Sequence, residues 1–232
     1  MRRSIVMILV FDVNETLLDL SGLDDVFGDV FSLPDADGRS VREDWFTELL
    51  HQALVTTVTG PFVDFGTLAK SAMRVTAFRQ NHELSEAHVE AVMQAVRTLP
   101  PHEDVVPALD RLAEASIPLV ALSNGTPDAL DAQLRNAGLT DRFDRIVSAQ
   151  ASGRLKPAAE PYLWVAEHLG VEPDELWMVA AHAWDTTGAL RAGLRAAFVR
   201  RPGKHIAPVD SKPDVAGDTL VDVAEQLANV AE

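Results

Sequence analysis

Short strand-like segments that alternate with helical patterns constrain the fold of this chain more than any other feature of its sequence. The first contains a continuous apolar run, ILVF, as expected of a strand covered on both faces. The six segments are Ile5 to Val13, Ile117 to Leu122, Arg145 to Ser148, Leu176 to Ala181, Ala196 to Val199 and Asp214 to Ala216. The helical patterns between them cover residues 102–115, 127–137, 159–169, 186–192 and 218–230. This alternation predicts an α/β protein, with a parallel sheet that carries helices on both faces.

Residues 20–98 interrupt the alternation, because no strand pattern appears between the first strand and residue 117. Helical patterns cover residues 41–58, 65–80 and 85–97, and the acidic, glycine-containing segment from Ser21 to Gly38 is predicted to be a loop. The sequence therefore predicts an all-helical insert. We expect residues 1–19 and 99–232 to form the core and residues 20–98 to form the insert.

Composition limits the classes of partner and chemistry. The chain has 232 residues, 47% of them hydrophobic, and a formal net charge of -15, which disfavours nucleic acid and anionic membranes as partners. It has no cysteine, so disulfides and thiolate metal sites are excluded, and a cytoplasmic location is expected. The N-terminal run is too short for a membrane span, which needs about 20 apolar residues. We interpret it as a strand rather than a signal peptide, because Asp12 ends it and no small-residue cleavage site follows.

Polar side chains follow four of the predicted strands. They are Asp12, Asn14, Thr16, Ser123, Asn124, Lys156, His182 and Asp185. In open parallel sheets, ligands bind beyond the carboxyl ends of the strands, so these residues predict one shared binding crevice.

Each of these residue types allows more than one role. Asp12 is suited to bind a metal, act as a base or act as a nucleophile, but an aspartate in this place can also simply cap the following loop. Lys156 would keep a nearby carboxylate ionised, or it is a solvated loop lysine. Ser123 and Asn124 precede a helix start, which offers either an anion site or a plain cap. Asp185 either caps a helix or holds Lys156.

Four segments in order, FDVNETLLD, LSNGTPDAL, LKPAAEPY and VAAHAWDTTGA, resemble the motifs of the haloacid dehalogenase superfamily. They are most similar to the type II 2-haloacid dehalogenases. The resemblance implies a Rossmann-like parallel sheet core with an all-helical cap inserted after the first motif. It also implies hydrolysis of the carbon–halogen bond of a short 2-haloacid, without a cofactor.

The resemblance implies a role for each matching residue. Asp12 is expected to attack the halogen-bearing carbon and form an ester, which water then hydrolyses, so the chemistry is covalent catalysis. Thr16 is expected to position Asp12, and Asp185 to orient Lys156 and water.

Other matching residues are expected to bind the substrate. Ser123, with Asn124 beside it, corresponds to the serine that binds the substrate carboxylate, and Tyr162 stands where the dehalogenases carry a tyrosine.

Asn14 separates two branches of this superfamily. Its phosphatases usually place a second aspartate two residues after the nucleophile, as the general acid that protonates the leaving alcohol. A halide needs no proton, so Asn14 favours dehalogenation and no required metal. The alternatives are a Mg²⁺-dependent phosphatase of the same superfamily and a non-catalytic or dimerising descendant.

Two positions depart from the dehalogenase pattern. Phe46 follows Trp45 where an arginine that helps bind the departing halide is expected, so Asn124 or Trp45 would have to assist instead. His182 replaces an asparagine near the hydrolytic water, and its imidazole is suited to activate that water, or it only holds the loop. The cap aromatics, including Trp45 and Phe46, are expected to shape an apolar pocket. A homodimer through the cap is expected from the resemblance.

Overall fold

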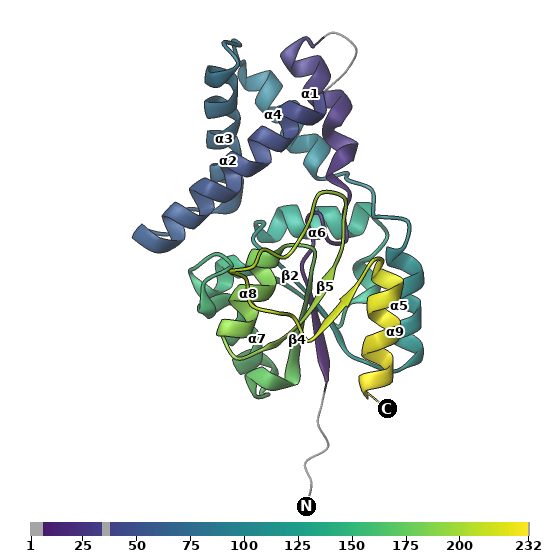
Figure 1. The fold of residues 1–232 in the computed structure, drawn as a ribbon. Helices are drawn as coiled ribbons and strands as arrows, with labels where there is room; N and C mark the ends of the chain where they lie inside the picture. Colours follow the sequence, from purple (N-terminus) through teal and green to yellow (C-terminus); the bar gives the residue numbers. More distant parts are fainter. Residues whose placement is uncertain (1–6, 34–37, 232) are drawn as a thin grey trace, which may run out of the picture.

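The computed structural model describes residues 7–33 and 38–231, and within them the strands form one parallel sheet (Figure 1). The strand order is β3-β2-β1-β4-β5-β6, and every neighbouring pair is parallel. The strands are β1 (Ile8–Phe11), β2 (Leu119–Ser123), β3 (Arg145–Ser148), β4 (Leu176–Ala180), β5 (Arg195–Val199) and β6 (Val215–Gly217). The predicted α/β fold is therefore confirmed. The first two residues of the predicted first strand, Ile5 and Val6, lie outside the described residues.

Helices cover both faces of the sheet. Successive residues of β1 point to opposite faces, so β1 contributes to a core on each side. Leu9 and Phe11 join a core with α5 (Val105–Glu114), α6 (Pro127–Asn136) and α9 (Leu220–Ala231). Ile8 and Val10 join a second core with α7 (Ala159–Leu169) and α8 (Ala183–Arg191). A central strand that is buried on both faces explains the continuous apolar run in the sequence.

The prediction of a loop from Ser21 to Gly38 is wrong up to Phe31, because the chain there forms a 3-10 turn (Leu20–Leu23) and helix α1 (Asp24–Phe31). Residues 34–37 of that predicted loop lie outside the described residues. Tertiary packing stabilises α1 despite its weak local pattern. The ring of Phe27 stacks on Phe31 and lies 5.3 Å from the ring of Trp45. Two aspartates in the first turn also favour the helix, since they face the positive end of its dipole.

The described part of residues 20–98 is helical and contains no named strand. Besides α1 it holds α2 (Gly38–Thr59), α3 (Phe65–Arg79) and α4 (Glu86–Val96). Figure 1 places these four helices beyond the carboxyl ends of the strands, where the sheet would bind a ligand. We propose that the cap is residues 20–98, as the sequence predicts, and that the rest forms the core. Among the described helices none is both long and apolar enough to cross a membrane.

We predict that Gly188→Ala lowers the free energy of unfolding by about 2 kcal/mol, because the methyl group of the alanine would overpack this site. A Cβ at Gly188 would lie 2.6 Å from Cβ of Pro157 and 2.9 Å from the hydroxyl of Tyr162. Gly66→Ala, in α3, is the control, since its Cβ would approach nothing closer than 3.2 Å. Urea denaturation measures both variants, and equal losses would contradict the prediction.

Candidate active site

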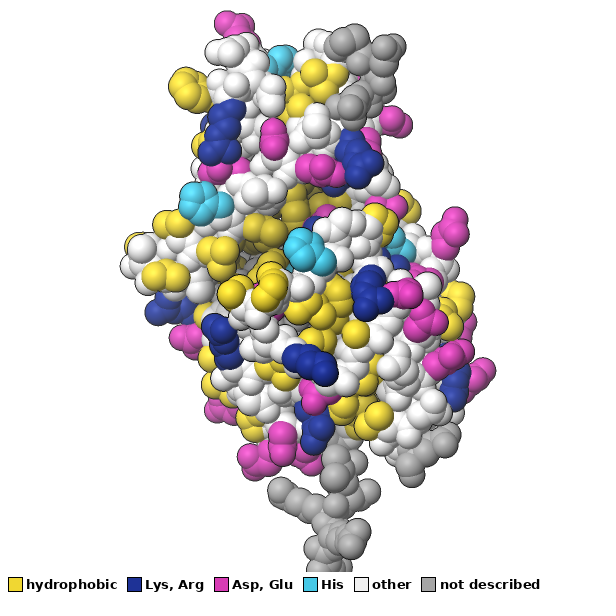
Figure 2. Space-filling model, viewed as in Figure 1, with side chains coloured by type: hydrophobic (Ala, Val, Ile, Leu, Met, Phe, Trp, Pro, Cys, Tyr) yellow, Lys and Arg dark blue, Asp and Glu magenta, His cyan; other side chains and the backbone are white. Residues whose placement is uncertain are grey.

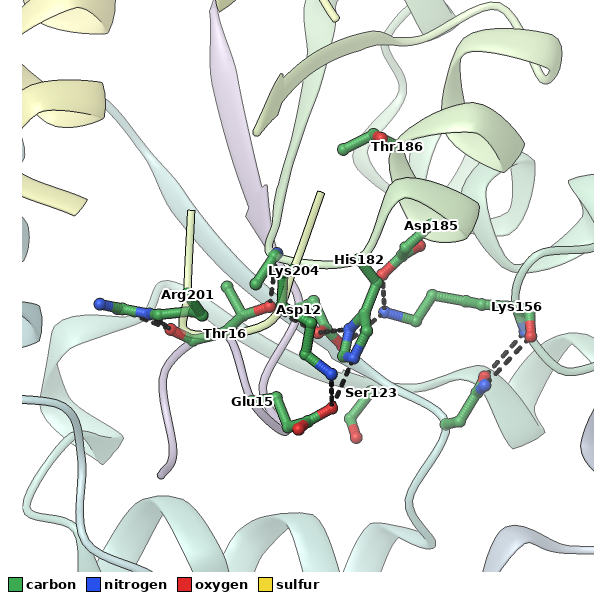
Figure 3. Close-up of polar contacts among 12 residues, drawn as sticks. Asp12, Glu15, Thr16, Ser123, Lys156, His182, Asp185, Thr186, Arg201 and Lys204 are labelled. Carbon is green, nitrogen blue, oxygen red and sulfur yellow. Dashed lines mark hydrogen bonds and ion pairs between the residues drawn. The ribbon is translucent and has the colours of Figure 1, made fainter. Parts of the chain in front are cut away.

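Asp12 lies directly after β1, at the centre of the sheet, with only 5% of its surface exposed (Figure 3). The Thr16 hydroxyl donates to Oδ2 of Asp12 at 2.6 Å, and Nζ of Lys156 donates to Oδ1 at 2.9 Å. Thr16 is itself fixed, because its Oγ1 accepts a hydrogen bond from the backbone N–H of Ala181. Burial opposes ionisation of Asp12, yet the charges of Lys156 and His182 hold its pKa well below the ordinary value. The carboxylate is therefore ionised and held in one orientation.

Lys156 is fully buried and uses all three of its ammonium hydrogens. Besides Asp12, its Nζ donates to Oδ2 of Asp185 at 2.6 Å and to the carbonyl of Leu122 at 2.9 Å. Burial would lower the pKa of Lys156, but the two carboxylates raise it above the ordinary value. Burial raises the pKa of Asp185, although Lys156 opposes the shift. The ammonium group thus joins the ends of β1, β2 and α8.

Two residues predicted to bind substrate instead contact the catalytic candidates in this structure. Tyr162 is fully buried and donates its hydroxyl hydrogen to Oδ1 of Asp185. Both atoms of the Asn124 amide engage the backbone of Lys156, with Nδ2 donating to its carbonyl and Oδ1 accepting from its N–H at 2.7 Å. These contacts position Asp185 and Lys156, and substrate contact by either residue stays a prediction.

Ser123 ends β2 and is buried beside the same edge of the sheet. Its Oγ accepts a hydrogen bond from the N–H of Gly125 at 3.0 Å. The following helix, α6, is capped by Thr126 and has Pro127 in its first turn, as the sequence predicts. The Ser123 hydroxyl and the start of α6 thus lie in one short segment.

A cavity of about 140 Å³ separates the helical insert from this edge of the sheet. Asn14, Gly125 and Thr126 line it on the core side, and Trp45 and Phe46 line it from α2. Its remaining apolar lining is Leu20, Leu23, Leu49, Phe65, Ala69, Met93, Val96, Leu99 and Ala129. Figure 2 shows apolar side chains gathered between the helices at the top and the core below. The cavity accommodates an apolar group next to the strand ends.

Both donors proposed to replace the missing arginine already form a hydrogen bond to a backbone carbonyl. The indole N–H of Trp45 donates to the carbonyl of Ala69 at 3.0 Å, and assistance by Trp45 to the departing halide stays a prediction. The amide of Asn124 is engaged with Lys156. Asn14 accepts a hydrogen bond from Nε2 of Gln133, in α6, through its side-chain oxygen.

His182 contacts two carboxylates at once. Its Nδ1 lies 3.3 Å from Oδ2 of Asp12, and its Nε2 lies 2.8 Å from Oε2 of Glu15. Burial would lower the pKa of His182, but the hydrogen bonds and charges of Asp12 and Glu15 raise it above the ordinary value. A carboxylate oxygen lies beside each ring nitrogen, and an ionised carboxylate can only accept, so this arrangement favours the doubly protonated imidazolium. We therefore treat His182 as a cation in contact with Asp12.

Glu15 and Lys204 were not among the residues predicted from the sequence. Nζ of Lys204 lies 2.6 Å from Oε2 of Glu15 and 5.9 Å from the ring centroid of Phe46. Glu15 lies inside the first motif, FDVNETLLD, and its place there is a signal that could have identified it as a site residue. Lys204 lies in the loop after β5, where the sequence offers no motif.

No group of three or more His, Cys, Asp or Glu side chains within the described ranges is arranged to hold a metal ion. The carboxylates of Asp12 and Asp185 are instead occupied by hydrogen-bond donors, with Lys156 shared between them. An ammonium group thus stands where two carboxylates converge.

Comparisons with known proteins agree with this fold. The family model of the haloacid dehalogenase-like hydrolases matches residues 6–193. The (S)-2-haloacid dehalogenase of Xanthobacter autotrophicus is 32% identical over 193 residues, which cover 83% of this chain and 74% of that protein. The (S)-2-haloacid dehalogenase of Pseudomonas sp. (strain YL) is 26% identical over 223 residues, 96% of this chain and 95% of that protein.

Solved structures extend the likeness to three dimensions. The L-2-haloacid dehalogenase of Xanthobacter autotrophicus, with chloropropionic acid covalently bound, superposes with a TM-score of 0.88 at 27% identity. That match covers 96% of this chain and 98% of the other. The chain belongs to the haloacid dehalogenase-like hydrolase family, which confirms the resemblance seen in its motifs.

We predict that Lys156→Met lowers the free energy of unfolding by about 3–5 kcal/mol near neutral pH, because two buried carboxylates lose their cation. With Lys156 present, the folded pKa of Asp12 lies below its ordinary 3.8, so its stabilising contribution is present above that pH and is lost in acid. Without Lys156, both carboxyl groups favour protonation. The loss should therefore shrink as the pH falls.

Denaturation with urea at about pH 7.5 and about pH 5 measures this difference. Lys70→Met is the matched control, because Lys70 forms an exposed ion pair with Glu90, and its loss should stay within about 0.5 kcal/mol. A loss for Lys156→Met that grows toward acid would contradict the prediction.

Proposed function

We propose that this protein is a hydrolytic dehalogenase of short 2-haloacids with Asp12 as the nucleophile. The observation that carries the proposal is the buried, ionised carboxylate of Asp12, held by Lys156 and Thr16. Asn14, two residues after Asp12, lines a largely apolar cavity under the helical insert. The relatives named above are 2-haloacid dehalogenases, which supports the same chemistry.

In the first step an oxygen of Asp12 attacks the carbon that carries the halogen. The new carbon–oxygen bond forms as the carbon–halogen bond breaks, and the electron pair leaves with the halide. Lys156 and Thr16 fix the carboxylate, so the attack does not require its reorientation. The halide leaves without a proton, and Asn14 supplies none, because it offers an amide that accepts from Gln133.

In the second step water adds to the carbonyl of the ester and the 2-hydroxyacid leaves. Lys156 remains against Oδ1 and stabilises negative charge on the carbonyl oxygen. His182 is the candidate base once its Nδ1 has lost its proton, since that atom stands 3.3 Å from Oδ2 of Asp12. General base catalysis of this kind contributes a rate factor of about 10² to 10⁴.

We propose that the substrate carboxylate binds at the end of β2. The Ser123 hydroxyl and the N-terminus of α6 provide donors and a favourable dipole for an anion. The alkyl part of the substrate then occupies the apolar cavity, with Trp45 and Phe46 as walls.

Release of halide tests the proposal. We expect halide from chloro- and bromoacetate and from 2-chloropropionate, with EDTA present and one halide per substrate consumed. Asp12→Asn should abolish release, because an amide is a poor nucleophile. Asp131→Asn, at an exposed ion pair on α6, is the control and should retain full activity.

Two results would overturn this function. Hydrolysis of phosphate esters that requires Mg²⁺, without halide release, would favour the phosphatase alternative. No turnover of any haloacid by the wild type would favour the non-catalytic alternative.

The role of His182 is tested by the ester intermediate. In single turnovers, His182→Asn should still release one halide, but loss of the ester should slow by about 100-fold, since the base is missing. His168→Asn, at an exposed histidine of α7, should behave as the wild type. Rapid quench and mass measurement of the protein follow the ester, and loss at the wild-type rate would rule out His182 as the base.

We also propose a homodimer through the helical cap. Val58 of α2 and Phe78 of α3 are 82% and 83% exposed, so the cap presents apolar side chains that a second copy would cover. Light scattering measures the mass in solution.

A further inference from the structure

We infer that Glu15 is a positioning residue that fixes the proton of His182 on Nε2, so that forming the ester on Asp12 converts Nδ1 from a donor into an acceptor. The inference rests on the proposed function and adds a residue to it. Glu15 acts through His182 and touches no reacting atom in this scheme.

The backbone at Glu15 is the first observation. Its φ is +62°, in the left-handed region that residues other than glycine rarely adopt. The N–H of Glu15 donates to the carbonyl of Leu18 at 2.9 Å, which closes the loop after β1. Backbone strain of this kind concentrates at functional sites, where the surrounding structure holds it in place. The residue with this strained backbone, Glu15, also carries the carboxylate that lies 2.8 Å from Nε2 of His182.

The charges around His182 are the second observation (Figure 3). Lys204, Glu15, His182 and Asp12 form a row of alternating charge, with contacts of 2.6, 2.8 and 3.3 Å. Burial opposes ionisation of Glu15, but His182 and Lys204 lower its pKa below the ordinary value. Glu15 is therefore ionised and keeps its acceptor on Nε2.

After Asp12 has become an ester, Glu15 is the negatively charged group that still contacts His182. Lys156 and Asp185 stand behind Asp12, and Lys204 stands behind Glu15. The rings of Phe46 and Trp184 pack on the imidazole and carry no charge. Within the part of the chain that the structure describes, Asp12 and Glu15 are the two carboxylates that contact this ring. Once Asp12 is an ester, one of these contacts is neutral.

The proton balance then follows. When the ester forms, the charge of Asp12 disappears and His182 releases its Nδ1 proton to solvent. This is the single proton that hydrolysis of a carbon–halogen bond yields. Nδ1 next takes a proton from water as the hydroxide adds to the ester carbonyl, and returns it to the departing alkoxide. The regenerated carboxylic acid of Asp12 finally gives its proton to Nδ1, which restores the resting imidazolium.

Glu15→Gln tests this inference, because it keeps the shape of the side chain and removes its charge. The imidazolium is then less stable, so His182 should titrate about one pH unit lower or more. Loss of the ester should slow by about tenfold or more at high pH, and its midpoint should move to lower pH. Glu48→Gln is the matched control, since Glu48 is a buried carboxylate of α2 that pairs with Arg79 away from this site.

Two measurements decide the outcome. Histidine-labelled protein gives the titration of His182 by NMR, with the signal assigned by its absence in His182→Asn. Rapid quench gives the pH dependence of ester loss.

An unchanged titration of His182 in Glu15→Gln would overturn the inference. So would slower ester loss with an unmoved midpoint, because that result indicates a merely structural role. If the wild type releases no halide, the proposed function fails, while the NMR titration still decides whether Glu15 controls the proton of His182.

Discussion

The ammonium group of Lys156 is the interaction on which the rest of the site depends. It lies with no exposed surface between Asp12 and Asp185 and also binds the carbonyl of Leu122. Two carboxylates this deeply buried would otherwise repel each other and take up protons. Lys156 therefore keeps the Asp12 carboxylate charged and joins three elements of the core, so the nucleophile is ready before any substrate arrives.

Charge alternates along the whole site. The row runs Lys204, Glu15, His182, Asp12, Lys156 and Asp185, and each contact joins a cation to an anion. A chain with a formal net charge of -15 can thus present a locally neutral site to an anionic substrate. Esterification of Asp12 removes one negative charge from the middle of this row. The neighbouring imidazolium then loses part of its stabilisation, which links the first chemical step to the second.

The sequence predicts the core well, because continuous apolar runs mark strands buried on both faces. The sequence also predicts that one edge of the sheet holds Asp12, Thr16, Lys156, His182 and Asp185, since the carboxyl ends of parallel strands lie together there. Helix α1 escapes prediction, because packing of Phe27 against Trp45 stabilises it rather than local propensity. The supporting contacts of Tyr162 and Asn124, and the pairing of Glu15 with Lys204, depend on tertiary positions that one sequence does not specify.

The nucleophilic role of Asp12 is tested most directly by a single turnover of excess enzyme in water enriched in ¹⁸O. If Asp12 forms the ester and water attacks its carbonyl, the heavy oxygen enters the Asp12 carboxylate, and the 2-hydroxyacid carries an oxygen from the protein. Peptide mass spectrometry locates the label. Heavy oxygen found in the product and absent from the peptide that contains Asp12 would show direct attack by water and contradict covalent catalysis.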